Sequence, residues 1–355
     1  MAVDQALATI SDHLYSGAIA GYSAGIMALC GDYAFGKSAD KQAAKETAAL
    51  AERDVAAVRE PALVGAGDSI VDAPRDVSKD GALSAGDSSQ ADGADRSAGI
   101  AAKLGLIGVI ITALGLASQT ASLVTRGIAI GRLPWGNMFE FASVISIVAV
   151  ATYLVLLGTK PQLRFIGVFV LPPVVLILVL AGLKLYVAAA PVVAALRSYW
   201  LAIHVTAASI AAGIFFVSTV ASALYLVKVR HERKEAEAGG PIPSRIAGSL
   251  PSSATLDRLA ARTVTFAFPI WTFAVIAGAI WAEAAWGRYW GWDPKETWAF
   301  ISWVVYAGYL HARATAGWKG NRAAYLNLLA ASTMLFNFVI VNTVVSGLHS
   351  YSGLS

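Results

Sequence analysis

The sequence predicts an all-α integral membrane protein with about eight transmembrane helices and a tryptophan-rich external loop. Of its 355 residues, 57% are hydrophobic and 14% are charged, whereas soluble globular domains contain about 25% charged residues. Eight apolar stretches are long enough to cross a bilayer as helices, which takes about 20 residues for about 30 Å of hydrocarbon. A chain of this composition belongs in a lipid bilayer, and we expect no nucleic-acid partner.

The expected spans have boundaries that are soft by several residues. They cover 13–35, 99–124, 138–158, 165–187, 199–227, 264–281, 297–315 and 324–345. They divide the chain into a first transmembrane helix (1–36), a cytoplasmic insert (37–97) and a seven-helix membrane domain (98–355). The external loop (282–296) lies between the sixth span and the seventh.

The first span and the insert differ sharply in composition. Residues 1–36 lack a basic leader and a small-residue cleavage site, so we expect this span to be retained in the protein. Residues 37–97 are rich in Ala, Asp, Ser and Gly. Such a stretch buries too little apolar surface to offset chain entropy, which predicts a mostly disordered insert. Its Ala-rich first half could form a transient helix, and both an inert linker and a regulatory tether are compatible with the composition.

Basic residues in the connections predict the orientation of the spans. Lys and Arg accumulate on the cytoplasmic side of membrane proteins. Here they are concentrated after the third, fifth and seventh spans, and the other short connections carry fewer. We therefore expect both termini and the tryptophan-rich loop on the external side of a cytoplasmic membrane.

The external loop contains the stretch "WGRYWGWDPKETW" at 286–298. Asp293, Pro294 and Glu296 form a helix-start signature, with Asp as N-cap and Glu closing a capping box, so both acids have a structural explanation. The tryptophans have one too, because Trp gathers at membrane interfaces. If the loop begins helically, however, Trp286 and Trp290 share one face.

Such a face would be flat and apolar, which suits a planar macrocycle. Trp292 would adjoin it beside the capped turn. Arg288 and Lys295 are placed to meet peripheral carboxylates of such a ligand.

The histidines favour haem as that macrocycle. His204 lies about five residues inside the fifth span and His349 just beyond the eighth, so both reach the leaflet of the loop. Two imidazoles from separate elements can bracket a haem iron, although a lone interfacial histidine is more often a plain polar residue. The single cysteine, Cys30, and the lack of a C-x-x-C-H segment exclude covalent attachment. We therefore expect haem b, held non-covalently; His231 is expected to be solvated, and His13 has no assigned role.

Other polar residues near the spans have plain explanations. Glu140 could pair with Arg126 or Arg132, or it could orient the loop beside the haem. Three asparagines of the eighth span are expected to form interhelical hydrogen bonds; these are Asn327, Asn337 and Asn342.

These residues resemble a known family. The string "WGRYWGWDPKE" resembles the WWD signature of haem-handling membrane proteins, and "SYWLAIHV", "YLHAR" and "SGLHSY" resemble the surroundings of that family's histidines. The similarity is greatest to the CcsA/ResC-type subunit of the system II cytochrome c synthase, and it covers about 103–355. The residues that match the signature are Trp286, Gly287, Trp290, Trp292, Asp293 and Glu296.

The resemblance implies roles for individual residues. His204 and His349 would be the external axial ligands of haem, cradled by the residues of the signature. His311 would lie about 20 Å below the outer end of its span, at 1.5 Å per residue. There it would contribute to an inner haem site shared with a ResB-type partner subunit. A neutral histidine bonded to a neighbouring carbonyl is the alternative for His311.

The resemblance also implies a function in cytochrome c biogenesis. Haem would move to the outer face and be presented to the thiols of C-x-x-C-H in apocytochrome c. The sequence contains no recognisable pair of nucleophile and base, so the chain would act as one subunit of a haem lyase and not alone. A haem exporter, a b-type haem electron carrier and a purely structural membrane subunit are the alternatives.

Overall fold

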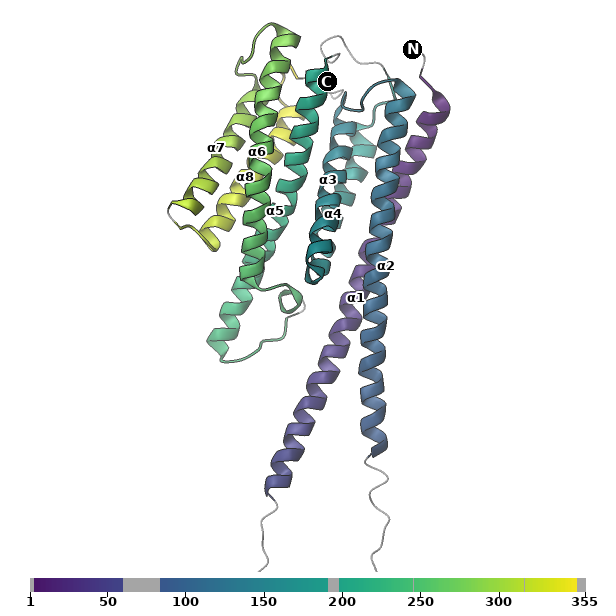
Figure 1. Ribbon diagram of the computed structural model, residues 1–355, viewed down its shortest axis with the longest axis vertical. Coiled ribbons are helices and arrows are strands. Elements are labelled where there is room, and N and C mark those ends of the chain that lie inside the picture. Colours follow the sequence, from purple (N-terminus) through teal and green to yellow (C-terminus); the bar gives the residue numbers. More distant parts are fainter. Residues whose placement is uncertain (1–2, 60–83, 191–197, 245, 316, 350–355) are drawn as a thin grey trace, which may run out of the picture. The chain divides into compact units, whose positions relative to one another are not determined.

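The computed structural model describes residues 3–59, 84–190, 198–244, 246–315 and 317–349, without the side chains of 37–59 and 84–94. All regular structure in these residues is helical, which confirms the predicted all-α class (Figure 1). The α-helices are α1 (Gln5–Arg59), α2 (Ser84–Ile130), α3 (Met138–Thr159), α4 (Gly167–Leu180), α5 (Tyr199–Ala238), α6 (Ser253–Trp286), α7 (Pro294–Ala314) and α8 (Asn321–Thr343). Short helical turns flank α4 and precede α6: η1 (Pro161–Ile166), η2 (Ala181–Leu185) and η4 (Ala247–Ser249).

The helices identify an integral membrane protein. Seven helical segments in the described part of the chain are long and apolar enough to cross a bilayer. Helix α7, a predicted span, is long enough at 21 residues but is not apolar enough to be among these seven. It begins with Lys295 and Glu296 and ends with His311 and Arg313, so polar residues at both ends lower its mean hydropathy.

The chain divides into two compact units, Met1–Ile26 with Val109–Ser355, and Met27–Gly108. In the second unit α1 and α2 pack closely, because a Cβ at Gly108 would lie 2.9 Å from Leu29 Cγ. Helix α1 continues to Arg59 and α2 begins at Ser84, so helix covers both ends of the predicted insert. Residues 60–83 lie outside the described residues, and the disorder of the insert stays a prediction.

Helix α5 is the centre of the bundle that carries the site, since it packs against α3, α6 and α8. Asn327 of α8 is fully buried, and its Nδ2 donates hydrogen bonds of 2.8 Å to the hydroxyls of Ser218 and Ser222 on α5. The interhelical role predicted for Asn327 is thus confirmed. In an apolar bundle such bonds fix the pairing and register of helices.

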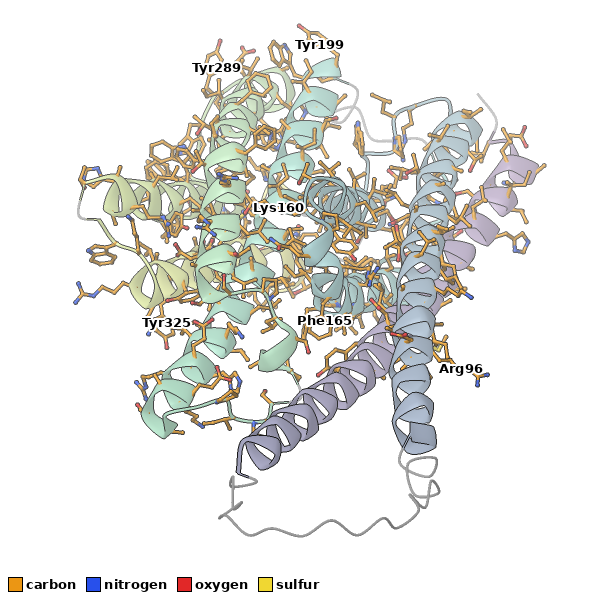
Figure 2. All side chains as sticks on the ribbon, turned by 60° about the horizontal axis from the view of Figure 1, so that its bottom comes forward. Arg96, Lys160, Phe165, Tyr199, Tyr289 and Tyr325 are labelled. Carbon is orange, nitrogen blue, oxygen red and sulfur yellow. The ribbon has the colours of Figure 1, made fainter. Side chains whose placement is uncertain are left out.

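The start of α5 and the end of α6 lie at the same end of the bundle. Figure 2 shows Tyr199, the first residue of α5, and Tyr289, in the loop that follows α6, at the same end of the bundle. Ser198 caps α5 by accepting a hydrogen bond from the Trp200 amide at 3.2 Å. Gly287 ends α6 in the left-handed conformation, at a φ of 71°, where glycine carries no steric cost. This arrangement places His204, on the second turn of α5, beside the tryptophan-rich loop.

The expectation that His231 is solvated was wrong. Helix α5 continues past the predicted end of the span at 227, to Ala238, and the following connection folds back on it. Lys228 Nζ donates to the carbonyl of Ala247 at 3.0 Å. His231 is therefore buried, with its Nε2 3.2 Å from Glu235 Oε1.

Candidate functional site

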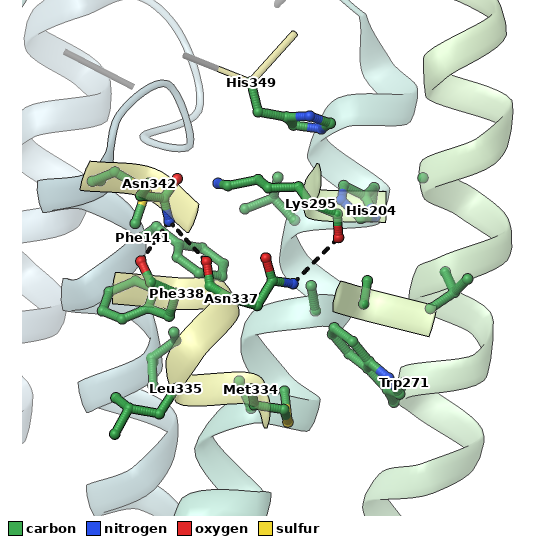
Figure 3. A pocket seen from close by; sticks show the side chains of 18 of the residues that line it. Phe141, His204, Trp271, Lys295, Met334, Leu335, Asn337, Phe338, Asn342 and His349 are labelled. Carbon is green, nitrogen blue, oxygen red and sulfur yellow. Dashed lines mark hydrogen bonds between the residues drawn. The ribbon is translucent and has the colours of Figure 1, made fainter. Parts of the chain in front are cut away.

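A cavity of about 700 Å³ opens among helices α3 to α8. Its volume lies in the range of small-molecule and cofactor sites, about 300–1,000 Å³. Most of its wall is aliphatic or aromatic, and Figure 3 shows Phe141, Phe338 and Trp271 on that wall. Both His204 and His349 line it, so the structure brings these two predicted ligands to one cavity although they lie far apart in the chain, on α5 and beyond the end of α8.

His204 is held in place by helix α6. Its Nδ1 lies 2.8 Å from the carbonyl oxygen of Ala274, an acceptor, so Nδ1 carries the proton and Nε2 is the ring nitrogen suited to a metal. The close approach of the two helices requires Gly278, because a Cβ there would lie 2.7 Å from His204 Cε1. Sequence reasoning missed Gly278.

His349 is held in place by the tryptophan-rich loop. Its Nδ1 lies 2.7 Å from Asp293 Oδ2, and Asp293 Oδ1 accepts the Leu348 amide at 2.7 Å. A Cβ at Gly347 would lie 2.7 Å from Asp293 Oδ1, so glycine is required where the chain passes the carboxylate. Asp293 was expected to cap α7 and to belong to the haem-cradling surface. It does cap α7, and it also orients His349.

The ionisation states of this pair follow from their surroundings. Burial lowers the pKa of His349 below its usual value, although the Asp293 hydrogen bond acts in the opposite direction. For Asp293, burial acts to raise the pKa, but the hydrogen bonds from His349 and Leu348 outweigh it and the pKa is lowered. At neutral pH a neutral imidazole therefore donates from Nδ1 to an ionised carboxylate. A carboxylate in this position fixes the tautomer and increases the basicity of the other ring nitrogen.

Trp281 joins the two imidazoles and was not identified from the sequence. It is 2% exposed. Its ring is nearly parallel to His204, with centroids 6.1 Å apart, and it meets His349 edge-on at 5.7 Å. Trp286 also meets His349 edge-on, at 5.0 Å. One sequence pattern could have identified Trp281: it lies three residues after Gly278, so the two share one face near the end of α6.

The tryptophan-rich loop does not begin helically, the condition under which Trp286 and Trp290 would share a helix face, because α6 ends at Trp286. Trp286 and Trp290 nevertheless both line the cavity. Trp292 is 66% exposed, has a positive φ of 58° and packs against Trp290 with centroids 5.8 Å apart. Neither Trp292 nor Gly287 is among the residues that line the cavity. Their predicted contact with haem stays a prediction.

The two cations of the loop have different surroundings. Arg288 pairs with Glu296 at 3.5 Å and lies over the ring of Trp286, at 5.9 Å. Glu296 closes the predicted capping box by accepting the Asp293 amide at 3.1 Å. Lys295 instead extends into the cavity (Figure 3).

Two asparagines of α8 line the cavity beside Lys295. Asn337 Nδ2 donates to the carbonyl of Lys295 at 3.4 Å, so its predicted interhelical bond is confirmed. Asn342 differs from the prediction, because its Nδ2 donates to the carbonyl of Phe338 in its own helix, at 2.5 Å.

Glu140 holds the segment between α2 and α3 against the cavity. It is fully buried and pairs with both Arg126, at 2.9 Å, and Arg132, at 3.0 Å. Its Oε2 also accepts the amide of Gly136 at 2.7 Å, and Gly136 lines the cavity beside Asn137. Glu140 therefore forms the predicted ion pairs with Arg126 and Arg132, and the same carboxylate also holds the loop at Gly136.

His311 lies away from this cavity. It is exposed in the last turn of α7, and it does not line the cavity of His204 and His349. Its proposed partner belongs to another chain, so the inner site stays a prediction. His13 is exposed on α1.

Comparison with known proteins gives consistent matches. The family model described as "Cytochrome C assembly protein" matches residues 135–349, which include both histidines of the cavity. The cytochrome c biogenesis protein CcsA of Guillardia theta is 37% identical over 263 residues, 70% of this chain and 86% of that protein. CcsA of Gloeobacter violaceus is 32% identical over 296 residues (70% and 87%). CcsA of Porphyra purpurea is 32% identical over 285 residues (71% and 89%).

Proposed function

Because this chain belongs to the cytochrome c assembly protein family, alongside the CcsA cytochrome c biogenesis proteins, we propose that it binds haem in the cavity of His204 and His349. It presents that haem to apocytochrome c at the outer face of the cytoplasmic membrane. Haem b is the substrate, and both termini of the chain are external. The observation that carries the proposal is that two distant imidazoles line one cavity beside Trp281, each with its Nδ1 on an oxygen acceptor.

The residues of the cavity suit haem in shape and in chemistry. Aromatic and aliphatic walls match a flat apolar macrocycle, and a bis-histidine pair is a common ligand set for haem iron. Trp281 packs against both rings and thereby limits their rotation. Rings that are already oriented lose less entropy when a ligand binds.

The reaction requires positioning rather than a catalytic side chain. Each thiol of C-x-x-C-H adds across one vinyl group of haem. A sulfur–carbon bond forms, and the thiol proton ends on the other vinyl carbon, so no oxidant is consumed. The chain's contribution is to hold the substrate, orient its edge and exclude competing reactions. A ResB-type partner subunit completes the synthase, and His311 contributes to an inner haem site shared with it.

Substitution of the histidines tests the proposal. The full chain is purified alone and with its membrane partner, and absorption spectra are recorded for wild type, His204→Ala, His349→Ala and His311→Ala. We expect a low-spin bis-histidine spectrum that is lost or shifted by either outer substitution, together with failure to mature a reporter cytochrome. His231→Ala, outside the cavity, is the matched control. A colourless wild-type protein in the presence of the partner would refute haem binding.

The same preparations distinguish the alternatives. A haem exporter moves haem without a partner and forms no thioether bond, so reporter maturation separates it from a synthase subunit. An electron carrier would bind haem permanently and show reversible redox cycling without loss of haem to an apocytochrome. A purely structural subunit would tolerate both outer substitutions.

A further inference from the structure

Lys295 is the one Lys or Arg among the described residues that line the cavity. It follows Pro294 in the first turn of α7, and Figure 3 shows its side chain below His349, with its nitrogen on the side of Asn342. Within the described part of the chain, its ammonium forms neither an ion pair nor a hydrogen bond. An ammonium group enclosed in a protein without a counter-ion is costly.

The two carboxylates of the same helix start are engaged elsewhere. Asp293 accepts the imidazole N–H of His349 at 2.7 Å. Glu296 lines the cavity as Lys295 does, but its ion pair is with Arg288, at 3.5 Å. Neither carboxylate forms an ion pair with Lys295 within 4 Å, so its nearest acidic neighbours leave the cation without direct neutralisation.

Neutral acceptors lie in the same part of the cavity. The side-chain oxygens of Asn337 and Asn342 are buried and accept no hydrogen bond from any residue that the structure describes. Amide oxygens can accept from an ammonium group, but they do not neutralise its charge. Lys295, Asn337 and Asn342, which we call the polar corner, therefore have hydrogen-bonding capacity and lack an anion.

We propose that the polar corner is a carboxylate site, in which Lys295 binds a propionate of haem. The inference rests on the proposed function and adds a third anchoring point to the two imidazoles. The sequence also predicted Arg288 as a partner for peripheral carboxylates. Its guanidinium, however, already pairs with Glu296 and lies over the Trp286 ring, so we assign the carboxylate to Lys295 alone. Most of the remaining wall is apolar, which fits a flat body with a charged edge rather than a small inorganic anion.

This contact sets the rotation of the macrocycle. Two axial imidazoles fix the iron but leave the ring free to turn about the axis that joins the two nitrogens. An edge contact removes that freedom, so the vinyl groups face one direction. Lys295 is thus a positioning residue for the thiol addition.

Esterification of the ligand tests the inference without any turnover. The full chain in neutral phosphatidylcholine nanodiscs is titrated with haem and with haem dimethyl ester, and affinity is read from the absorption spectrum. We expect wild type to prefer the free acid about tenfold or more. Lys295→Met should bind both probes with the affinity that wild type has for the ester, and Lys295→Arg should keep the preference. Lys319→Met, an exposed lysine in the loop before α8, changes net charge equally and should behave as wild type.

Each other outcome counts against the inference. An undiminished preference in Lys295→Met overturns it and leaves the proposed function intact. A wild type that binds neither probe overturns both. Loss of the wild-type preference when phosphatidylglycerol is added assigns the site to a lipid phosphate instead. If Lys295→Met binds neither probe, Lys295→Arg and Lys295→Gln are compared instead. Equal preferences of these two variants for haem over its dimethyl ester would overturn the inference.

Discussion

His349 Nδ1 lies 2.7 Å from Asp293 Oδ2, so the last histidine of the chain is oriented by the carboxylate that also caps α7. The substitution Asp293→Asn separates these two roles, because Asn caps helices about as well as Asp but carries no charge. We expect the helix to persist and the haem affinity to fall about 10-fold to 100-fold, as is typical for loss of an outer-shell carboxylate. Haem titration measures the affinity, and circular dichroism checks the helix.

The matched control for that prediction is Glu237→Gln. Glu237 is an exposed carboxylate near the end of α5, paired with Arg233. The substitution Glu237→Gln changes the net charge by the same amount as Asp293→Asn. Its position lies far along α5 from His204. Equal affinities in wild type and Asp293→Asn would mean that Asp293 serves only as a cap.

Gly278→Ala should disrupt the cavity of His204 and His349 although it removes no charged or hydrogen-bonding side chain. The new Cβ would lie 2.7 Å from His204 Cε1 and 2.8 Å from Nδ1, so the imidazole must move. We expect the absorption spectrum of His204→Ala. Gly308→Ala on α7, where a Cβ meets no described atom within 4 Å, is the control and should keep the wild-type spectrum.

The helical class, most of the membrane-spanning helices in the described residues and the location of His204 and His349 at one end of the bundle were predictable from the sequence, because apolar length and depth within a span are local properties. The contact of Trp281 with both imidazoles was not, since it depends on how α5, α6 and the segment after α8 pack. The same is true of Gly278, whose requirement appears only when the helix opposite is in place. The burial of His231 was missed because charge in a connection predicts solvation only if the connection does not fold back.

The ligand-free chain should show an unusually acidic imidazolium at His349. Burial lowers the pKa of His349 below its usual value near 6.5, so the ring loses its proton at a lower pH than a solvated histidine. Asp293 acts to raise this pKa, so Asp293→Asn should lower it further. Imidazole chemical shifts measured by NMR across a pH series give the pKa of His349 in both proteins. A pKa of His349 above the usual histidine value would contradict the prediction.

Glu140→Gln should destabilise the bundle more than it weakens any ligand contact. Glu140 is fully buried and neutralises Arg126, which is 2% exposed, so the neutral amide leaves a buried cation without its counter-ion. Removal of one partner from such a pair costs about 3–5 kcal/mol. Thermal unfolding in detergent should therefore show a lower midpoint than wild type, whereas the exposed substitution Glu237→Gln should leave the midpoint unchanged. Because Glu140 also holds Gly136 at the cavity wall, the remaining folded protein should bind haem more weakly. An unchanged midpoint with weaker haem binding would assign Glu140 to the loop alone.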